Sequence, residues 1–458
     1  MDISRRNLLK ASGLSVAAFA VTGCGVAASA SVTPEIKSEA AVKKLMPKSA
    51  GKRVVIVGGG WGGLTAARNV KKQAPDAEVV VLEKRALFTS CPISNEWLVG
   101  EIPLDFLTRD FFTAAKEYGY KMLQTTVTDI DRKSRTVATT CGTIDYDYLV
   151  LSPGIRYDYS GWFGDDAQMA ERCRQECPPA LMQGSEHAAL KKILEDFEGG
   201  NFIISIPDGA YRCPPAPYER AALIANYFRK NDIDGKVIIL DPKDSPKPKG
   251  PGFMAAYKEL YADIVEFHPN SSVKGVDLDK KELKVAVTDA DLKTTMKIVK
   301  FDAANLIPVN AASELIEKAG VSMGKAGWGS MKVPTFQTKA DDRVFVIGDS
   351  VGGYPYPKSG SIANGQGYIV ADQIASRIKG TKEITNVTLP VNTCYSMVND
   401  TEAISISAAF SLVDAKDPEG NPIKKIVGDK KANNKRSAAL GKGTHNWYQG
   451  MMTDLFGA

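Results

Sequence analysis

The first part of the chain alternates short apolar runs with a segment of helical spacing. Residues 53–57 and 78–82 are rich in valine and isoleucine, which favour strands, and residues 64–70 between them have the spacing of a helix. A strand, a helix and a second strand in this order predict parallel strands joined by a crossover helix. The pattern therefore indicates an α/β fold.

The turn between the first predicted strand and the helix is rich in glycine. Gly58, Gly60 and Gly63 have the spacing of the dinucleotide-binding fingerprint, and Glu83 follows the second strand at the expected distance. The first glycine allows the tight turn, the second lets backbone approach a pyrophosphate, and the third lets the helix pack on the strand. Glu83 is placed to bind a ribose hydroxyl group. The fingerprint alone does not separate FAD from NAD.

Two later segments favour FAD. Residues 148–154 read as an apolar strand that ends at Gly154, and residues 343–349 read as another that ends at Gly348 and Asp349. Both resemble the closing motifs of flavoproteins with two dinucleotide-binding domains, the glutathione-reductase-like group. The resemblance implies that Asp349 binds the ribityl chain and that the next helix points its N-terminus at the flavin. The alternative is that Asp349 is only a helix N-cap.

The segment between these two runs has the pattern of a second nucleotide-binding domain without its glycine loop. Residues 201–206 read as its first strand, residues 221–229 as its helix and residues 236–241 as its next strand. A proline-rich stretch that contains Cys213 stands in place of the glycines. Prolines and large side chains prevent a close approach of the backbone to a pyrophosphate. We therefore expect no pyridine nucleotide here, and we expect Cys213 to lie beside the flavin.

The predicted architecture is glutathione-reductase-like α/β, with two Rossmann-type domains and a smaller C-terminal α+β domain. We assign residues 51–160 and 300–384 to the FAD-binding domain, residues 161–299 to the second nucleotide-like domain and residues 385–458 to the C-terminal domain. In the C-terminal domain, the alternation of residues 404–412 predicts a strand. Residues 414–422 read as a turn, the basic residues from 424 to 436 as a solvated face, and residues 446–456 as an amphipathic tail.

The first thirty residues resemble a twin-arginine export signal. Arg5 and Arg6 lie in a Ser-Arg-Arg-x-Leu-Leu-Lys motif that is followed by an apolar, small-residue stretch. The alternatives are an ordinary secretory signal and a disordered basic tail. Ala-Ser-Ala at residues 28–30 has the form of a peptidase site, and Cys24 lies in a lipobox-like sequence where a lipid would anchor the protein. We expect cleavage of residues 1–30 and export to the periplasm, where disulfides persist.

Composition narrows the range of partners. Apolar residues make up 44% of the 458 residues and charged residues 24%, the balance of a globular protein. The formal net charge of +5 is too small to imply nucleic acid. No run after the signal reaches the roughly 18 apolar residues of a membrane-spanning helix. The chain has seven cysteines but only three histidines. Three histidines are too few for a histidine-rich metal site, and we expect none.

Four peptides resemble one known family, the flavoprotein subunit of flavocytochrome c sulfide dehydrogenase, a relative of sulfide:quinone reductase. They are Ser-Cys-Pro-Ile-Ser-Asn-Glu at residues 90–96, Tyr-Arg-Cys-Pro-Pro-Ala-Pro-Tyr-Glu-Arg at 211–220, Tyr-Pro-Lys-Ser-Gly-Ser-Ile-Ala-Asn at 356–364 and Asn-Thr-Cys-Tyr-Ser at 392–396. The resemblance covers nearly the whole mature chain. It implies a covalent bond from Cys91 to the 8α-methyl group of FAD, a redox disulfide between Cys213 and Cys394, and a c-type cytochrome as electron acceptor.

The expected activity is the oxidation of hydrosulfide. Hydrosulfide attacks one sulfur of a disulfide and leaves a persulfide on one cysteine and a thiolate on the other, from which two electrons reach the flavin. The chain has no Cys-x-x-Cys-His motif, so the cytochrome must be a separate chain. We expect Lys358 to stabilise charge on the reduced flavin; the alternative is a solvated surface lysine. Glu219 either handles protons near Cys213 or pairs with a neighbouring arginine.

Several assignments stay open at this stage. The disulfide between Cys213 and Cys394 is either a redox centre or a structural cross-link. Two functions remain as alternatives to sulfide dehydrogenase. One is a sulfide:quinone reductase, and the other is an accessory flavoprotein that reactivates a thiosulfate-oxidising complex by thiol exchange. Cys173 and Cys177, four residues apart, form a second disulfide or a weak metal half-site, and Cys141 reads as a small buried residue between strands. The three histidines, His187, His268 and His445, lie in polar contexts with no catalytic assignment.

Overall fold

A computed structural model describes residues 43–382, 384–416 and 418–457, and residues from Lys44 onward form one compact unit. The predicted signal in residues 1–30, with Arg5, Arg6 and the possible lipidation site Cys24, lies outside the described residues. In the part of the chain that is described, no helix is both long enough and apolar enough to span a membrane.

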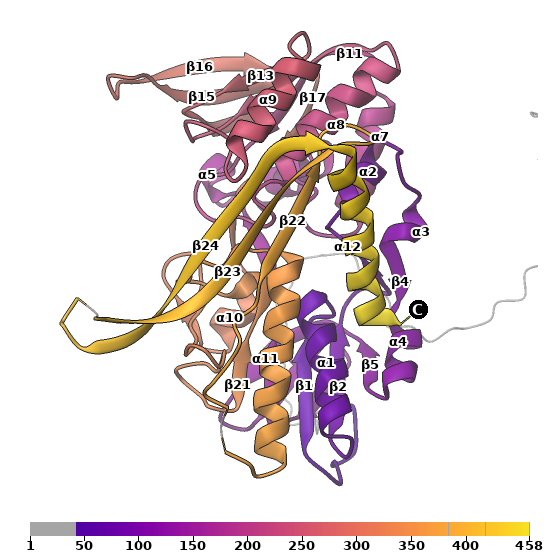
Figure 1. Cartoon of the computed structure of the whole chain (residues 1–458), viewed down its shortest axis with the longest axis vertical. Helices are drawn as coiled ribbons and strands as arrows, with labels where there is room; N and C mark the ends of the chain where they lie inside the picture. Colours follow the sequence, from indigo (N-terminus) through magenta and orange to yellow (C-terminus); the bar gives the residue numbers. More distant parts are fainter. Residues whose placement is uncertain (1–42, 383, 417, 458) are drawn as a thin grey trace, which may run out of the picture. The chain divides into compact units, whose positions relative to one another are not determined.

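The largest parallel sheet has the strand order β21-β9-β1-β2-β5, and all four neighbouring pairs are parallel. Its strands are β1 (Arg53–Val57), β2 (Glu78–Glu83), β5 (Lys121–Gln124), β9 (Tyr148–Leu151) and β21 (Val344–Val346). Helices α1 (Trp61–Gln73) and α11 (Gly360–Ile378) pack against each other beside this sheet (Figure 1). The predicted strands at residues 53–57 and 78–82 are present, and those predicted at residues 148–154 and 343–349 end earlier, at Leu151 and Val346. Because β9 and β21 are neighbours, the two ends that carry Gly154 and Asp349 meet at one edge.

A second parallel sheet has the order β13-β12-β11-β17. Its strands are β11 (Gly199–Ser205), β12 (Asp234–Leu240), β13 (Val265–His268) and β17 (Ala303–Leu306), accompanied by helices α7 (Ser185–Glu195), α8 (Ala216–Lys230) and α9 (Gly250–Leu260). Helix α8 begins five residues before the predicted position. This earlier start places Pro217 in the first turn of the helix. Proline fits there because the first-turn N–H groups of a helix have no intrahelical partner. Two parallel sheets confirm the predicted fold class.

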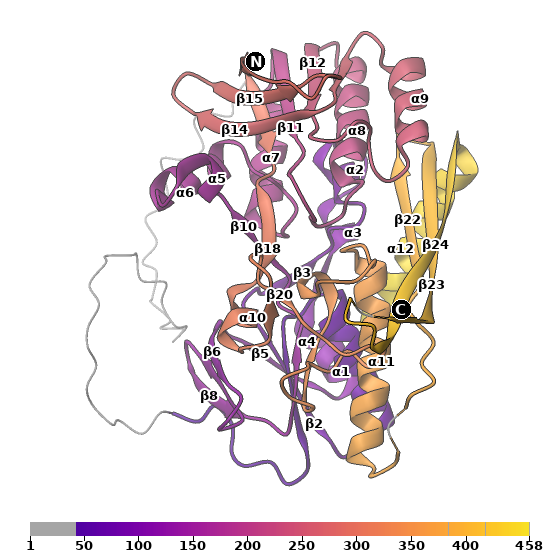
Figure 2. The ribbon, with the colours of Figure 1, turned by 90° about the vertical axis from the view of Figure 1, so that its left-hand side faces the viewer.

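The C-terminal part consists of an antiparallel sheet and a helix: β22 (Asn392–Met397), β23 (Ala403–Lys416), β24 (Pro422–Ser437) and α12 (Ala438–Phe456). Figures 1 and 2 show β23 and β24 as a long ribbon in yellow and orange, next to β22. The predicted turn at residues 414–422 is too long, since β23 continues to Lys416 and β24 starts at Pro422. An ion pair of 2.6 Å between Asp414 and Lys424, which lie opposite each other, stabilises the extended pairing.

The remaining elements connect or flank these sheets. They are β3 (Leu87–Thr89), α2 (Ser94–Leu98), α3 (Leu104–Leu107), β4 (Thr108–Asp110), α4 (Phe111–Tyr118), β6 (Val127–Asp131), β7 (Thr136–Thr139), β8 (Gly142–Asp145), β10 (Ile155–Asp158), α5 (Ser160–Phe163), α6 (Ala167–Glu176), β14 (Ser271–Asp277), β15 (Glu282–Thr288), β16 (Thr294–Lys300), β18 (Val309–Ala312), α10 (Glu314–Lys318), β19 (Ser322–Met323), β20 (Trp328–Gly329) and a 3₁₀ turn at Gly348–Ser350. Strands β10 and β18 pair antiparallel, and β14, β15 and β16 form a separate antiparallel sheet.

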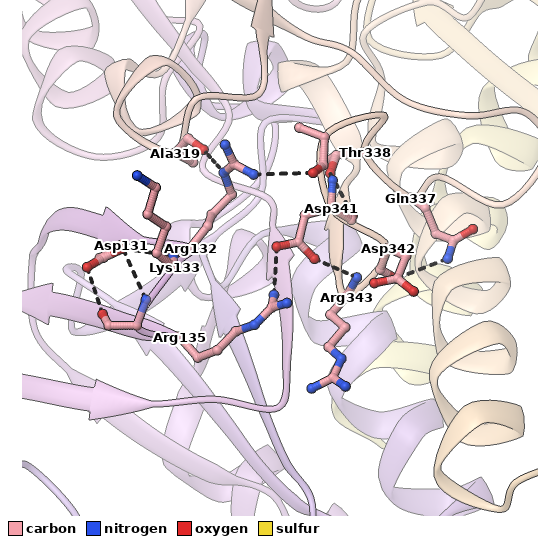
Figure 3. A network of polar contacts seen from close by, with 12 residues as sticks. Asp131, Arg132, Lys133, Arg135, Ala319, Gln337, Thr338, Asp341, Asp342 and Arg343 are labelled. Atoms are coloured by element: carbon pink, nitrogen blue, oxygen red, sulfur yellow. Dashed lines mark hydrogen bonds and ion pairs between the residues drawn. The ribbon is translucent and has the colours of Figure 1, made fainter.

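A network of polar contacts fixes the chain just before β21 (Figure 3). Arg135, in the turn between β6 and β7, forms an ion pair of 2.7 Å with the largely buried Asp341. The N–H of Asp341 donates to the hydroxyl oxygen of Thr338 at 3.0 Å. Arg132, in the same turn, donates to the carbonyl oxygen of Ala319. These contacts anchor the start of the strand whose far end carries Asp349.

Candidate functional site

The glycine-rich turn after β1 leaves the start of α1 open. Gly58 has φ +101°, and a Cβ added there would lie 2.3 Å from the carbonyl oxygen of Ser152. A Cβ on Gly63 would lie 2.0 Å from the carbonyl oxygen of Gly58, so neither position has space for a side chain. A Cβ on Gly60 would meet nothing within 4 Å, and Gly60 caps α1 without a side-chain hydrogen bond. The free N–H groups of this helix end therefore face open space, which is an arrangement that binds phosphate.

Glu83 closes the same turn from the end of β2. Its carboxylate accepts a hydrogen bond from the N–H of Gly59 at 2.7 Å and pairs with Arg85 at 2.9 Å. Burial opposes ionisation, but the hydrogen bonds from Arg85 and Gly59 outweigh it and hold the pKa of Glu83 below its usual range. An ionised carboxylate at this position can accept hydrogen bonds from a ribose, and the ribose contact itself stays a prediction.

Three adjoining pockets, together called the trough here, run past these residues. The outer end of the trough is lined by Gly58, Glu83 and Thr125, and its middle by Gly60, Gly154 and Asp349. Its inner end contains the three cysteines Cys91, Cys213 and Cys394 together with Lys358. Neighbouring sections share residues: Gly58 and Glu83 join the outer to the middle section, and Arg212, Ser359 and Gly360 join the middle to the inner section.

The trough fits an elongated dinucleotide. Gly58, Gly154 and Gly348 all have positive φ, and a Cβ on Gly154 would meet nothing within 4 Å. The backbone at Gly154 is therefore bare, as a ligand that touches main chain requires. The hydrogen-bond donors of the middle section are the N–H groups at the start of α1. The hydrogen-bond acceptor of the outer section is the carboxylate of Glu83. This order of groups suits the pyrophosphate and the adenosine ribose of FAD.

Asp349 pairs with a half-buried arginine, Arg212, that the sequence analysis did not single out. Arg212 Nε lies 3.1 Å from Asp349 Oδ2, and the Arg212 N–H donates to Asn310. The alternative role of Asp349 as the cap of the next helix is wrong, because the side chain of Ser359 caps α11. Asp349 is 9% exposed and lines the middle of the trough. Its partner Arg212 immediately precedes Cys213. The ion pair therefore joins the middle of the trough to the loop that carries this cysteine.

Lys358 is buried, which excludes the alternative of a solvated surface lysine. Its ammonium donates to the carbonyl oxygens of Asp349 at 2.7 Å and Val351 at 2.9 Å, and it lies 3.4 Å from the centre of the Trp328 ring. Burial lowers the pKa of Lys358 to about 8, against the raising effect of the Asp349 charge. Lys358 thus holds a fixed positive charge at the inner end of the trough near neutral pH.

Cys91 and Cys213 lie in contact at the inner end. A hydrogen bond from Cys213, together with the charges of Arg212 and Arg220, lowers the pKa of Cys91 to about 7 despite burial. The same hydrogen bond to Cys91, with burial, raises the pKa of Cys213 well above its usual value. Cys213 has φ +52° and its N–H donates to the carbonyl oxygen of Lys358 at 2.8 Å. The proline-rich loop therefore brings this cysteine to the segment that leads into α11.

Cys394 lies on β22 and reaches the same place from the C-terminal sheet. Its thiol accepts a long hydrogen bond from Lys249 Nζ at 3.8 Å, and that ammonium also donates to Ser396 Oγ at 2.7 Å. Burial raises the pKa of Cys394, while Lys249 acts in the opposite direction. Cys213 and Cys394 both line the inner trough, and the charge of Cys394 contributes to the raised pKa of Cys213. The structure thus brings together the two cysteines that the resemblance pairs; both are thiols here.

Glu219 is a buried acid beside Lys249 and the cysteines. Burial raises the pKa of Glu219 to about 7, against the lowering effect of Lys249. Its carboxylate accepts hydrogen bonds from the N–H of Met397 at 2.9 Å and from the amide of Asn95 at 3.1 Å. The alternative that Glu219 pairs with Arg220 is wrong: the guanidinium of Arg220 donates instead to Asn95, Asn305 and the carbonyl oxygens of Pro179 and Ala180.

A second cavity lies on the other side of the cysteines. It has a volume of about 650 Å³ and shares Cys213, Lys358, Ser359 and Cys394 with the inner trough. Its wall also contains Lys247 and Lys430, with tyrosines at 211, 354 and 356. The two cysteines therefore form part of the partition between a cofactor-shaped trough and a separate, positively charged cavity.

The other cysteines and histidines lie away from this partition. Cys173 and Cys177, at the end of α6, are fully buried and hydrogen-bonded to each other, and no cluster that could hold a metal ion occurs in residues 43–457 as described. Cys141 lies in the turn between β7 and β8 as predicted, but it is partly exposed because that turn is at the surface. His187 is buried, contacts Ser94 Oγ at 3.1 Å and has a pKa lowered by burial to about 3. His445 pairs with the buried Glu96 at 2.7 Å.

Family comparisons agree with this geometry. A model described as sulfide dehydrogenase [flavocytochrome c] flavoprotein chain, central, matches residues 187–308, and one described as flavocytochrome c sulphide dehydrogenase, flavin-binding, matches residues 388–456. A third, pyridine nucleotide-disulphide oxidoreductase, matches residues 52–176. The fold and the trough define the chain as a two-dinucleotide-domain flavoprotein. The chain belongs to the family that comprises the flavocytochrome c sulfide dehydrogenase flavoproteins and the related sulfide:quinone oxidoreductases.

Individual relatives are distant over most of the chain. Mitochondrial sulfide:quinone oxidoreductase of Mus musculus is 24% identical over 307 residues, which cover 65% of each chain and so less than two thirds of that relative. The sulfide dehydrogenase [flavocytochrome c] flavoprotein chain of Chlorobaculum thiosulfatiphilum is 46% identical over 44 residues, 10% of this chain and 92% of that one. The X-ray structure of sulfide:quinone oxidoreductase from Aquifex aeolicus has a TM-score of 0.67 at 19% identity and covers 89% of this chain and 92% of its own.

Proposed function

We propose that this protein is a sulfide dehydrogenase flavoprotein subunit, which oxidises hydrosulfide through Cys213 and Cys394 and transfers the electrons through FAD to a c-type cytochrome. The observation that carries the proposal is the position of the two cysteines between the trough and the second cavity. A small anion in the second cavity reaches the sulfur atoms without displacing the cofactor. The family models and the sulfide:quinone oxidoreductase relatives support sulfide as the substrate class.

The chain's own residues bind and orient the cofactor. Gly58, Gly60 and Gly63 leave the start of α1 open for the pyrophosphate, and Glu83 accepts hydrogen bonds from the adenosine ribose. Asp349 lies in the middle section, where the ribityl chain would pass. When bound, FAD supplies a two-electron acceptor that can release electrons singly.

Two further residues act at the inner end of the trough. Lys358 holds its ammonium on two carbonyl oxygens, and this fixed charge stabilises the negative charge that a flavin gains on reduction. Cys91 is the residue proposed to bind FAD covalently. Its lowered pKa increases the fraction of thiolate, the nucleophilic form, near neutral pH.

The proposed acceptor is a c-type cytochrome on a separate chain. Strand β24 carries exposed lysines on its two faces, which give an acidic partner complementary charge: Lys424, Lys425, Lys430, Lys431 and Lys435. The proposal includes export through the twin-arginine signal in residues 1–30 to the periplasm, with a lipid on Cys24 as the alternative to cleavage. An oxidising compartment favours the disulfide form of the cysteine pair.

The deciding experiment measures the electron acceptor directly. The FAD-loaded protein is mixed anaerobically with sulfide and, in parallel, with oxidised cytochrome c or a short-chain quinone. We expect sulfide-dependent reduction of cytochrome c, a slower or absent reaction with quinone, and capture of a haem protein in a pull-down from the native periplasm. Reduction of quinone alone would identify a sulfide:quinone reductase. The third outcome is that sulfide does not bleach the flavin while the protein still exchanges thiols with a partner. That result would identify an accessory flavoprotein.

A further inference from the structure

We propose that Lys249 determines which of the two cysteines receives the sulfur of hydrosulfide: its ammonium stabilises Cys394 as the leaving thiolate and so directs attack to Cys213. This inference rests on the proposed function and adds a catalytic residue and a direction to its first step. Neither the glycine motifs nor the cysteine peptides pointed to Lys249.

Lys249 is an unusual lysine because both its backbone and its side chain are constrained. It precedes α9 with φ +67°, a left-handed conformation that is uncommon for a residue with a side chain. The residue is 3% exposed, and its ammonium lies 5.7 Å from the centre of the Phe253 ring. An ammonium removed from water in this way must be compensated by nearby negative charge or by hydrogen-bond acceptors. Strain and burial at one residue are typical of functional sites.

The ammonium is directed at β22. Its hydrogen bonds to Cys394 Sγ at 3.8 Å and Ser396 Oγ at 2.7 Å reach two residues on the same face of the strand, because side chains alternate along a strand. Ser396 is fully buried and holds the ammonium in place. The remaining ionisable group that acts on both Lys249 and Cys394 is Glu219, from α8. Lys249 therefore has two acidic groups near it, the Glu219 carboxyl group and the Cys394 thiol.

The surroundings of Cys213 are different. Its thiol contacts Cys91, and its N–H donates to the carbonyl oxygen of Lys358. Within the described residues, Cys394 is the member of the pair that accepts a hydrogen bond from a cationic side chain. In thiol–disulfide exchange the sulfur whose thiol has the lower pKa leaves faster. The geometry therefore makes Cys394 the better leaving group and Cys213 the sulfur that is attacked.

The resulting step balances in atoms, charge and electrons. The sulfur of hydrosulfide forms a bond to Cys213 Sγ, and the bond between Cys213 Sγ and Cys394 Sγ breaks. Its electron pair remains on Cys394 Sγ as a thiolate beside the Lys249 ammonium, and the hydrosulfide proton stays on the terminal sulfur of the new persulfide. The sulfide sulfur loses two electrons and the disulfide gains them. Since the second cavity reaches both cysteines, access does not select between them and electrostatics does.

The experiment locates the added sulfur. The oxidised, FAD-loaded protein receives less than one equivalent of sulfide anaerobically, is quenched within milliseconds with an alkylating agent, and is digested for mass spectrometry. We expect the extra sulfur atom on the Cys213 peptide and an alkylated thiol on the Cys394 peptide, in a ratio of at least ten to one. The reverse distribution in the unmodified protein would overturn the proposal without any variant being needed.

Variants separate charge from structure. Lys249→Met should abolish the preference for Cys213 and slow bleaching by tenfold or more, whereas Lys249→Arg, which keeps the cation, should retain the preference. Lys430→Met removes a lysine from the wall of the same cavity without touching Cys394, and should leave the distribution unchanged. Retention of the native distribution in Lys249→Met would refute the role of Lys249 while the sulfide dehydrogenase function stands. If sulfide does not react with the unmodified protein at all, both proposals fail.

Discussion

The N–H of Cys213 donates a hydrogen bond of 2.8 Å to the carbonyl oxygen of Lys358. This contact joins the loop that replaces the second glycine fingerprint to the segment that leads into α11 on the first sheet. A cysteine from one nucleotide-like unit is thereby held against the cofactor trough of the other. The arrangement explains how the second unit contributes to the site even though its loop does not have the form of a nucleotide site.

We expect Cys213→Ser and Cys394→Ser each to abolish sulfide-dependent bleaching of the flavin, by at least a hundredfold in rate. Either change removes the disulfide, and with it the electrophilic sulfur that hydrosulfide attacks. The measurement is an anaerobic sulfide titration followed by absorbance. Cys173→Ser is the matched control, because Cys173 is buried in a different cluster and should leave the bleaching rate unchanged. If the flavin of both variants bleaches at the parent rate, the disulfide between Cys213 and Cys394 is only a structural cross-link.

Cys91 should carry the cofactor through a covalent bond. After acid denaturation and centrifugation, we expect the yellow colour in the protein pellet, whereas Cys91→Ala should release FAD into the supernatant. Cys141→Ala, a change in a partly exposed surface turn, serves as the control and should retain the colour. Free FAD from the parent protein would contradict the covalent bond. It would leave the rest of the site assignment intact, since the contacts proposed for the trough residues are non-covalent.

Local sequence patterns predicted the first sheet and the turn that carries its glycines, because each motif lies within one strand–turn–helix unit. The spacing of Gly58, Gly60 and Gly63 reports steric demands of a single turn, and Glu83 ends the adjacent strand. Resemblance to a family then pointed to Cys213 and Cys394, which the structure brings to one partition. No pattern within residues 201–220 or 392–396 alone would have paired them.

Residues whose role depends on long-range packing were missed. Lys249 lies 145 positions from Cys394, and Arg212 meets Asp349 across two different sheets. Both appear in the sequence as ordinary charges in polar or proline-rich stretches. The strand ends at Lys416 and Pro422 were missed for a related reason: the polar residues there have low strand propensity, and cross-strand pairing overrides it.

Gly60→Ala should weaken FAD binding without destabilising the apoprotein. Since a Cβ there meets no protein atom within 4 Å, the fold has space for it, but the methyl group would lie at the open start of α1, where we propose that the pyrophosphate binds. In a Cys91→Ala background, we expect at least a tenfold increase in the Kd of FAD, measured by fluorescence quenching, and an unchanged Tm of the apoprotein. Gly161→Ala, in α5 and equally unhindered, is the control. Equal affinities of the two variants would argue against this pyrophosphate site.

Glu219 should make the stability of the protein depend on pH in a defined window. Its pKa rises from 4.5 to about 7 on folding, chiefly through burial, so the folded state binds a proton more tightly than the unfolded state. The stabilisation from this group is complete below pH 4.5 and is lost as the pH rises through about 7, a change on the order of 3 kcal/mol. Glu219→Gln keeps the shape and cannot titrate. We expect its free energy of unfolding, from urea denaturation of the apoprotein, to fall less than that of the parent between these pH values. Parallel pH profiles for the two proteins would contradict the assignment of a proton to buried Glu219 near neutral pH.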